Sequence, residues 1–486
     1  MEMKTNSIEK GGRKEVIIFL IFILMLLLLG LWFIWSNSLL LWDENVFLGN
    51  ARSHISLSNF IEDFRFPLLE YIIASVWFFT GESVFSARLL SVFFYILSVF
   101  TFYLIMNILF NKDKKVILFS ALFAITPVML YWSFRVYADI LSMAMSLLVV
   151  YFLIMYSLSK NKYSFIVLVG FFSSMAFLAR FALAILVFSV FVYLIIKKDK
   201  KAFFLFALVS LLSILPWLFY NWINYGNMFW DLLYYQQSVN MWTTREPIIN
   251  EIKNIALNLG FLIIFFIPGL VCFINKMSGE IRGKKAGIYS FLSFYILLSI
   301  IYYTFFVNLK DERYVIIMLP FFFLISFFGL NYIAKKIYFS GRKIKKIGCI
   351  LITFLLLFSF IFFLSIDLSK FYASSECQKE NAILYSINYI KNNSLLSDGD
   401  VIISNHWPYY AYYFNVKAYA IWGSNLDEKI EEYKPKLFIL KENDGTDYTT
   451  KSIESSENII SLQNFSDKCG NKIKIYAINF STSSLS

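Results

Sequence analysis

The chain has 486 residues, of which 59% are hydrophobic, 20% are aromatic and only 16% are charged. A soluble globular protein carries about 25% charged residues, so this composition excludes an ordinary soluble enzyme and indicates a polytopic membrane protein. The formal net charge of +11 does not indicate a nucleic-acid partner, because most basic residues fall in short loops between apolar runs, as is typical of cytoplasmic loops.

The first apolar run covers residues 16–35 and follows four basic residues. It is about as long as a membrane span needs to be. A cleavable signal peptide would have a shorter apolar core and small residues before the cleavage site, whereas Trp32, Phe33 and Trp35 end this run. We therefore expect a retained membrane anchor with its N-terminus in the cytoplasm.

Two adjacent carboxylates, Asp43 and Glu44, follow this span closely. Ionisable groups at a bilayer boundary are costly to desolvate and often mark a functional cavity. The alternative is that they begin an interfacial helix, because a helix dipole favours acidic residues in the first turn. Their position alone leaves both interpretations open.

The short apolar run at residues 67–80 is better explained by a helix on the outer membrane surface than by a crossing. Ten longer runs predict membrane spans at residues 84–110, 116–132, 138–157, 164–179, 182–196, 203–220, 255–274, 288–307, 314–334 and 348–366. With about eleven spans in total, every strongly basic loop falls on the same side as the N-terminus, as the positive-inside rule requires.

This topology predicts a multi-pass protein of the plasma membrane with a transmembrane domain at residues 1–366. Its first outer loop covers residues 36–83, and a long aromatic outer loop covers residues 221–251. Residues 367–486 then form an extracytoplasmic domain. Periodicity there indicates a small α/β domain, with helices at 377–392 and 426–433 and strands at 401–403, 417–422, 437–440 and 473–478.

Cys377 and Cys469 bracket the C-terminal domain. In an oxidising compartment they could form a disulfide, and two free thiols are the alternative. The segment from His406 to Tyr410 is rich in aromatic residues, and we expect it to pack the core of this domain.

The expected outer loops carry these ionisable candidates: Asp43, Glu44, His54, Arg65, Arg135, Asp139, Arg180 and Arg313. Arginine holds phosphate through forked, charge-assisted hydrogen bonds, and a carboxylate can act as a general base. Together they indicate a protein that handles a phosphorylated lipid. The sequence contains no P-loop, zinc His-Glu motif or nucleotide-binding glycine fingerprint, and two histidines exclude a His-rich metal centre.

Each candidate also has a simpler structural explanation. Asp139 begins a span and could cap a helix, or it could pair with Arg135 four residues earlier. His54 could be a surface residue, and Arg88 and Arg180 could anchor helices at the membrane interface by snorkelling.

A first span followed by an outward Asp-Glu pair resembles the GT-C superfamily, the large membrane-embedded glycosyltransferases that use polyprenyl-phosphate sugars. The closest branch contains the protein O-mannosyltransferases and the lipid A aminoarabinose transferase. Its acidic element and Pro-Leu surface helix are similar to Asp43–Phe47 and to the segment from Arg65 to Tyr71. Further similar segments follow in order at residues 81–91, 127–139, 216–227 and 313–320. The resemblance covers roughly residues 15–335, and the C-terminal domain shares only its general character with the domains of such enzymes.

The resemblance implies transfer of a sugar from a polyprenyl-phosphate donor to a protein, lipid or glycan acceptor. It implies that Asp43 is the catalytic base or positions the acceptor, with Glu44 and Asp139 in support. For substrate binding it names Arg65, Arg135, Arg180, Arg313, Tyr314 and His54. The acceptor hydroxyl would lose its proton to Asp43 and attack the anomeric carbon in one inverting displacement, while arginines stabilise the leaving polyprenyl phosphate. Family members differ in their need for metal, so a divalent cation stays open and no metal ligand is named.

Two other functions compete with this one. A transporter or flippase of lipid-linked saccharide would be expected to show internal repeats and broken helices with charges near the membrane midplane, and the sequence shows no clear repeat. A non-catalytic scaffold that binds partners through its tail would not need the acidic pair beside arginine-bearing loops.

Overall fold

The computed structural model describes residues 12–478, apart from residues 38, 57–60, 63, 160–161, 235–244, 284–286, 340–341, 380, 421–425 and 443–458. The chain packs as two compact units. The helical unit comprises Met1–Trp32, Phe64–Leu69 and Leu89–Ser369. The sheet unit comprises Phe33–Asp63, Glu70–Arg88 and Lys370–Ser486. The predicted domain boundary after residue 366 stays a prediction. The helix of the first loop, α2, packs in the same unit as the C-terminal residues.

The predicted spans all correspond to helices, because a chain in lipid must satisfy its backbone hydrogen bonds internally. The helices up to residue 225 are α1 (Gly12–Ser36), α2 (Trp42–Ser56), α3 (Leu68–Thr80), α4 (Val84–Leu109), α5 (Lys115–Ala124), α6 (Pro127–Ser133), α7 (Ala138–Leu158), α8 (Lys162–Ala179), η1 (Phe181–Leu183), α9 (Ala184–Lys197) and α10 (Lys200–Tyr225). Those that follow are α12 (Ile248–Leu259), η2 (Gly260–Leu262), α13 (Ile263–Arg282), α14 (Ile288–Phe305), η3 (Glu312–Val315), α15 (Leu319–Tyr338) and α16 (Arg342–Lys379).

In the described part of the chain, nine helices are long and apolar enough to cross a membrane, or ten when the bent pair α5 and α6 counts as one span. The bend of 57° interrupts the span predicted at 116–132. Its cause is Pro127, which cannot continue the helix and holds Thr126 in an extended conformation. The predicted span at 182–196 is the shorter apolar helix Phe181–Lys197. The predicted polytopic helical fold is confirmed.

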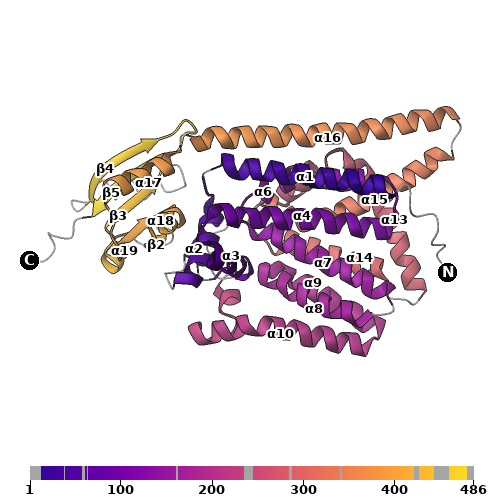
Figure 1. The fold of residues 1–486 in the computed structure, drawn as a ribbon, viewed down its shortest axis with the longest axis horizontal. Coiled ribbons are helices and arrows are strands. Elements are labelled where there is room, and N and C mark those ends of the chain that lie inside the picture. The colour runs from indigo at the N-terminus through magenta and orange to yellow at the C-terminus, as the bar shows by residue number, and fades with distance from the viewer. Residues whose placement is uncertain are drawn as a thin grey trace, which may run out of the picture. The chain divides into compact units, whose positions relative to one another are not determined.

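Within the helical unit, α7 packs along α8, α8 along α10, and α13 along α15 (Figure 1). The last pair is unusually close. A Cβ atom added at Gly329 would lie 1.8 Å from the carbonyl oxygen of Phe265, and one added at Gly269 would lie 1.9 Å from that of Ile325. Two glycines therefore allow the backbones of α13 and α15 to approach each other, as small residues do in many membrane helix pairs.

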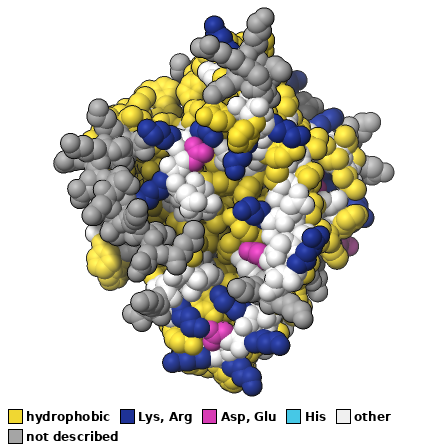
Figure 2. Space-filling view, turned by 90° about the vertical axis from the view of Figure 1, so that its right-hand side faces the viewer, with side chains coloured by type: hydrophobic (Ala, Val, Ile, Leu, Met, Phe, Trp, Pro, Cys, Tyr) yellow, Lys and Arg dark blue, Asp and Glu magenta, His cyan; other side chains and the backbone are white. Residues whose placement is uncertain are grey.

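Basic residues mark one end of several helices in this unit. Lys197 ends α9, Arg282 ends α13, and Lys335 and Lys336 lie in the last turn of α15. Figure 2 shows a face on which Lys and Arg side chains clearly outnumber Asp and Glu. This distribution agrees with the basic loops on which the predicted orientation depends.

The C-terminal part of the sheet unit is the predicted α/β domain. Its helices are α17 (Ala382–Asn392), α18 (Trp407–Phe414) and α19 (Leu426–Tyr433), and its strands are β1 (Val401–Ser404), β2 (Lys417–Ala420), β3 (Leu437–Lys441), β4 (Ile459–Ser466) and β5 (Lys472–Ile478). The strands form one sheet in the order β2-β1-β3-β5-β4 (Figure 1). Strand β1 is parallel to β2 and β3, and β5 is antiparallel to β3 and β4.

Alternating apolar residues place helices on both faces of this sheet. Ile402 and Leu437 point to the face covered by α17 and α18, whereas Ile403 and Phe438 point to the face that Ile430 of α19 covers. The prediction missed α18 and β4. The predicted bridge between Cys377 and Cys469 involves a side chain outside the described residues and stays a prediction.

Candidate active site

The predicted acidic pair begins helix α2, and Glu44 serves that helix directly. The Glu44 carboxylate accepts a hydrogen bond from the backbone N–H of Leu41 at 3.0 Å. This contact satisfies one of the N–H groups that the start of a helix leaves without a partner. The interfacial helix start considered from the sequence is therefore real, and both carboxylates lie in its first turn.

Glu44 is also half of a buried ion pair. Arg88, near the start of α4, places its Nε 3.0 Å from Glu44 Oε1 and its Nη2 3.3 Å from Oε2. The same guanidinium donates to the carbonyl oxygens of Leu39, at 2.9 Å, and of Asn37. Glu44 and Arg88 are 0% and 1% exposed. Arg88 thus fixes the connection between α1 and α2, and it does not snorkel to an interface.

Asp43 lies one residue before Glu44 and points about 100° away around the helix. Its side chain is largely buried, with 8% of its surface exposed, whereas Glu44 has none. A catalytic role for Asp43 stays a prediction.

His54 lies at the other end of α2 in a network that fixes the first loop. Its Nε2 is 3.5 Å from the buried carboxylate of Glu70, and its ring centroid is 4.7 Å from that of Tyr71. Asn50 donates to Glu70 at 2.8 Å and to the carbonyl of Glu62 at 2.7 Å. A substrate-binding role for His54 stays a prediction, and the contacts that the structure shows are those of a loop anchor.

Aromatic packing joins α2 to the C-terminal domain inside the sheet unit. The ring centroid of Trp42 lies 5.6 Å from that of His406, 5.9 Å from Trp407 and 6.5 Å from Tyr409. The segment expected only to pack the domain core therefore also contacts the residue directly before Asp43. The aromatic run 407–414 was the signal that could have indicated such an interface.

One of the predicted arginines, Arg180, lies beside Asp139 in the helical unit. Asp139 lies in the first turn of α7 and forms an ion pair with Arg180, which precedes η1. The carbon at the centre of the Arg180 guanidinium lies 4.6 Å from the ring centroid of Tyr314 in η3. The structure thus brings together three predicted residues from three elements, and it shows Asp139 paired with Arg180, 41 residues away.

Arg313 and Arg135 lie in the same unit in different surroundings. Arg313 donates to Asp311 at 2.9 Å, and its guanidinium lies 5.0 Å from the ring of Tyr137. Arg135 is fully buried, with its guanidinium 4.9 Å from the ring of Tyr131.

Arg65 is placed by the residue that follows it. Phe66 is buried, and its ring lies 6.1 Å from that of Phe181 and 6.0 Å from that of Trp217. Trp217 is fixed in turn by a hydrogen bond from its Nε1 to the buried carboxylate of Asp231, at 2.7 Å. This cluster holds the Arg65 segment against the one that follows Arg180.

A cavity of about 300 Å³ lies beside Tyr314. Residues of α12, α14, η3 and α15 line it, and its walls are mainly apolar. Lys310 also lines it and was not predicted. This buried lysine donates to the carbonyl oxygens of Thr304 at 3.0 Å and Val307 at 2.7 Å, so it satisfies acceptors near the end of α14. The position of Lys310 between a predicted span and a charged loop was the sequence feature that could have indicated it.

The predicted site residues therefore divide between the units. Asp43, Glu44 and His54 belong to the sheet unit, and Arg65, Arg135, Asp139, Arg180, Arg313 and Tyr314 belong to the helical unit. Among the described residues, no group of three or more His, Cys, Asp or Glu side chains could hold a metal ion.

We compared the chain with models of known protein families and with solved structures. Residues 65–220 match the family described as dolichyl-phosphate-mannose-protein mannosyltransferase. The structure of ArnT from Cupriavidus metallidurans in the apo state matches with a TM-score of 0.63 at 11% identity, over 96% of this chain and 98% of that one. The chain has the fold of ArnT. No curated protein sequence matches it.

Two further solved structures share this fold with a lipid phosphate present. ArnT from Cupriavidus metallidurans bound to undecaprenyl phosphate matches with a TM-score of 0.63 at 10% identity, over 95% of this chain and 97% of that one. The archaeal oligosaccharyltransferase AglB from Archaeoglobus fulgidus, in complex with an inhibitory peptide and a dolichol-phosphate, matches with a TM-score of 0.59 at 12% identity, over 86% of this chain and 69% of that one. The predicted resemblance is confirmed at the level of the fold, which the chain shares with ArnT and AglB, and the family model matches residues 65–220.

Proposed function

We propose that this protein is a membrane glycosyltransferase that moves a sugar from a polyprenyl-phosphate donor to an acceptor outside the cytoplasm. The observation that carries the proposal is the apolar cavity beside Tyr314, together with the Arg180 guanidinium that lies over the Tyr314 ring. A polyprenyl phosphate has the same two parts, an apolar chain and an anionic head. ArnT and AglB, which share this fold, hold undecaprenyl phosphate and dolichol-phosphate.

In this proposal the helical unit binds the donor. Arg180 holds the phosphate with its forked donors, and Arg313, Arg65 and Arg135 are further phosphate contacts. Asp139 keeps Arg180 in place through their ion pair. The Tyr314 ring lies against the Arg180 guanidinium, and Tyr314 also lines the apolar cavity.

The sheet unit supplies the base. Asp43 takes the proton from the acceptor hydroxyl, and the oxygen attacks the anomeric carbon with inversion. The bond between that carbon and the phosphate oxygen breaks, and its electron pair leaves with the polyprenyl phosphate, whose charge the arginines stabilise. Glu44 positions Asp43 by fixing the start of α2 through Arg88 and Leu41. In the same loop, we assign His54 to binding of the acceptor.

We place the N-terminus in the cytoplasm and the C-terminal domain outside the plasma membrane. The basic ends of α9, α13 and α15 support this orientation.

A transfer assay tests the proposal. The full chain is purified into lipid nanodiscs and supplied with radiolabelled polyprenyl-phosphate hexoses and pentoses, together with protein, lipid and oligosaccharide acceptors. We expect one donor to be used, Arg180→Ala to reduce transfer by about 10²-fold or more, and Arg282→Ala, at an exposed helix end, to have no effect. Movement of label across a liposome membrane without transfer to any acceptor would overturn the proposal in favour of a flippase.

A further inference from the structure

Strand β2 leaves one side open at the edge of the sheet. In the described part of the chain it pairs with β1 alone, from Val401↔Lys417 to Ser404↔Ala420. The outward N–H and C=O groups of such an edge strand can accept a further strand. At the end of this strand, Lys429 donates a hydrogen bond to the carbonyl of Ala420.

A groove of about 290 Å³ runs beside this edge. Six consecutive residues, from Asn415 through the whole of β2 to Ala420, form one wall. Gly49 and Arg52 of α2, with Ile61, contribute to the rest, as do Trp407 and Ala411 of α18. All of these residues belong to the sheet unit.

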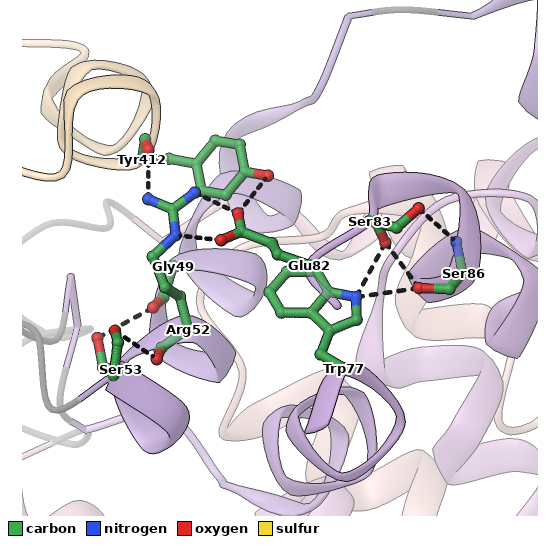
Figure 3. Close-up of polar contacts among 9 residues, drawn as sticks. Gly49, Arg52, Ser53, Trp77, Glu82, Ser83, Ser86 and Tyr412 are labelled. Carbon is green, nitrogen blue, oxygen red and sulfur yellow. Dashed lines mark hydrogen bonds and ion pairs between the residues drawn. The ribbon is translucent and has the colours of Figure 1, made fainter. Parts of the chain in front are cut away.

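Several contacts fix the position of Arg52, which lines the groove on the side of α2. Figure 3 shows the Arg52 guanidinium between Glu82 and Tyr412. It donates to Glu82 Oε2 at 2.9 Å and to the carbonyl of Tyr412 at 2.7 Å, and it lies 4.6 Å from the Tyr412 ring. Burial lowers the pKa of Arg52, but the hydrogen bonds and charge of Glu82 and the interaction with Tyr412 together outweigh it, so this pKa lies above its usual value.

Two further contacts keep this side of the groove in place. Trp77 donates to the carbonyl of Ser83 at 2.9 Å and to Ser86 at 3.0 Å, which holds the turn that carries Glu82 (Figure 3). A Cβ atom at position 49 would lie 2.2 Å from the end of the Ile61 side chain, so Gly49 leaves room for Ile61 to lie against α2.

The groove lies along the helix that begins with the acidic pair. Trp42, Gly49 and Arg52 are spaced to share one face of α2, and Trp42 is the residue before Asp43. Gly49 lies six positions after Asp43, which is about 9 Å along the helix axis. A ligand seated beside β2 would therefore be held on the element that carries the proposed base.

We propose that this groove binds an extended segment of an acceptor polypeptide, which adds to the open edge of β2 as a sixth strand. This inference rests on the proposed function and names its acceptor class. A peptide backbone can pair with the outward N–H and C=O groups of β2, which a lipid or a glycan would not satisfy in register. The lining contains no Asp or Glu, and because Glu82 pairs with Arg52, Lys417 is the lining charge that favours acidic residues in the bound segment.

The test uses a degenerate pool of labelled 12-residue peptides rich in Asp, Ser and Thr, because strand addition depends on the backbone more than on one sequence. A second pool has the same composition with alternate backbone nitrogens methylated, which removes the N–H donors. Binding to the full-length protein is measured by fluorescence anisotropy without donor, and sugar transfer is measured with donor. Ala418→Trp fills the groove, and Ile460→Trp on the exposed face of β4, at the other edge of the sheet, is the matched control.

We expect the first pool to bind the wild type and the Ile460→Trp variant equally, and to bind Ala418→Trp at least tenfold more weakly. The methylated pool is expected to bind the wild type at least tenfold more weakly, since it lacks several hydrogen bonds. Equal binding of both pools overturns strand addition, and this comparison uses no variant. If the protein transfers sugar to a lipid or an oligosaccharide and Ala418→Trp leaves that transfer unchanged, the polypeptide acceptor is overturned. The glycosyltransferase function then still stands. Peptide binding in this pattern without transfer from any donor supports the site and defeats the function.

Discussion

Replacing Arg88 with Met is expected to destabilise the start of α2 by about 3–5 kcal/mol, because it leaves the Glu44 carboxylate buried without its cation. Glu44 is 0% exposed, and the hydrogen bond from the Leu41 N–H, which is neutral, does not replace the lost cation. The hydrogen bonds to the carbonyls of Asn37 and Leu39 are lost as well.

The double variant Glu44→Gln/Arg88→Met should be less destabilised than Arg88→Met alone. It contains no buried charge at either position, and the glutamine oxygen can still accept from Leu41. The loss is then about 2 kcal/mol, roughly 1 kcal/mol for each carbonyl left without a donor. A second substitution that restores stability is the signature of a buried ion pair.

Hydrogen exchange of the Leu41 amide measures this local opening directly, in detergent and without global unfolding. Arg88→Met should accelerate exchange by about 10²- to 10³-fold, since each 1.4 kcal/mol is a factor of about ten, and the double variant by much less. Exchange in Arg88→Met within about threefold of the wild type would refute the reasoning, as would additive effects of the two substitutions.

Two further results are expected. Gly329→Ala should lower the thermal midpoint and cost about 1–3 kcal/mol, because its Cβ would clash with the Phe265 carbonyl, whereas Gly279→Ala, with nothing within 4 Å, should be neutral or slightly stabilising; equal effects would contradict the close approach of α13 and α15. Burial raises the pKa of Asp467, but hydrogen bonds from Asn471 and nearby backbone N–H groups lower it more, so its pKa lies below the usual 3.8. Its stabilising effect is therefore present above pH 3.8 and is lost as pH falls through the lower folded value. Thermal midpoints measured from pH 6 down to pH 2 should accordingly fall less steeply for Asp467→Asn than for the wild type, and parallel curves would exclude this role.

The order of the membrane helices was readable from the sequence because long apolar runs have few alternatives to helix in a bilayer. The C-terminal strands were readable where apolar residues repeat, as in β3. Strand β4 was missed because it is an edge strand with mostly exposed residues. Helix α18 was missed because most of its residues are aromatic, which are weak helix formers, and its second residue is a proline.

The site shows the limit of sequence reasoning more sharply. Asp43 and Glu44 are equivalent by position, and only the fold reveals that Arg88, 44 residues away, pairs with Glu44. Likewise, Arg135 and Asp139 are four residues apart, which is the spacing of an ion pair on one helix, yet the structure pairs Asp139 with Arg180. Such choices depend on tertiary contacts between distant segments, which the spacing of residues in one sequence does not encode.

The most direct test of the central claim is the single-turnover rate of sugar transfer from polyprenyl phosphate by Asp43→Asn. The substitution keeps the size of the side chain and removes its charge, and Asp398→Asn, at an exposed position in the same unit, is the matched control. We expect Asp43→Asn to lower the rate by about 10²-fold or more with donor binding unchanged, and Asp398→Asn to match the wild type. Transfer by Asp43→Asn at the wild-type rate would contradict the assignment of Asp43 as the base.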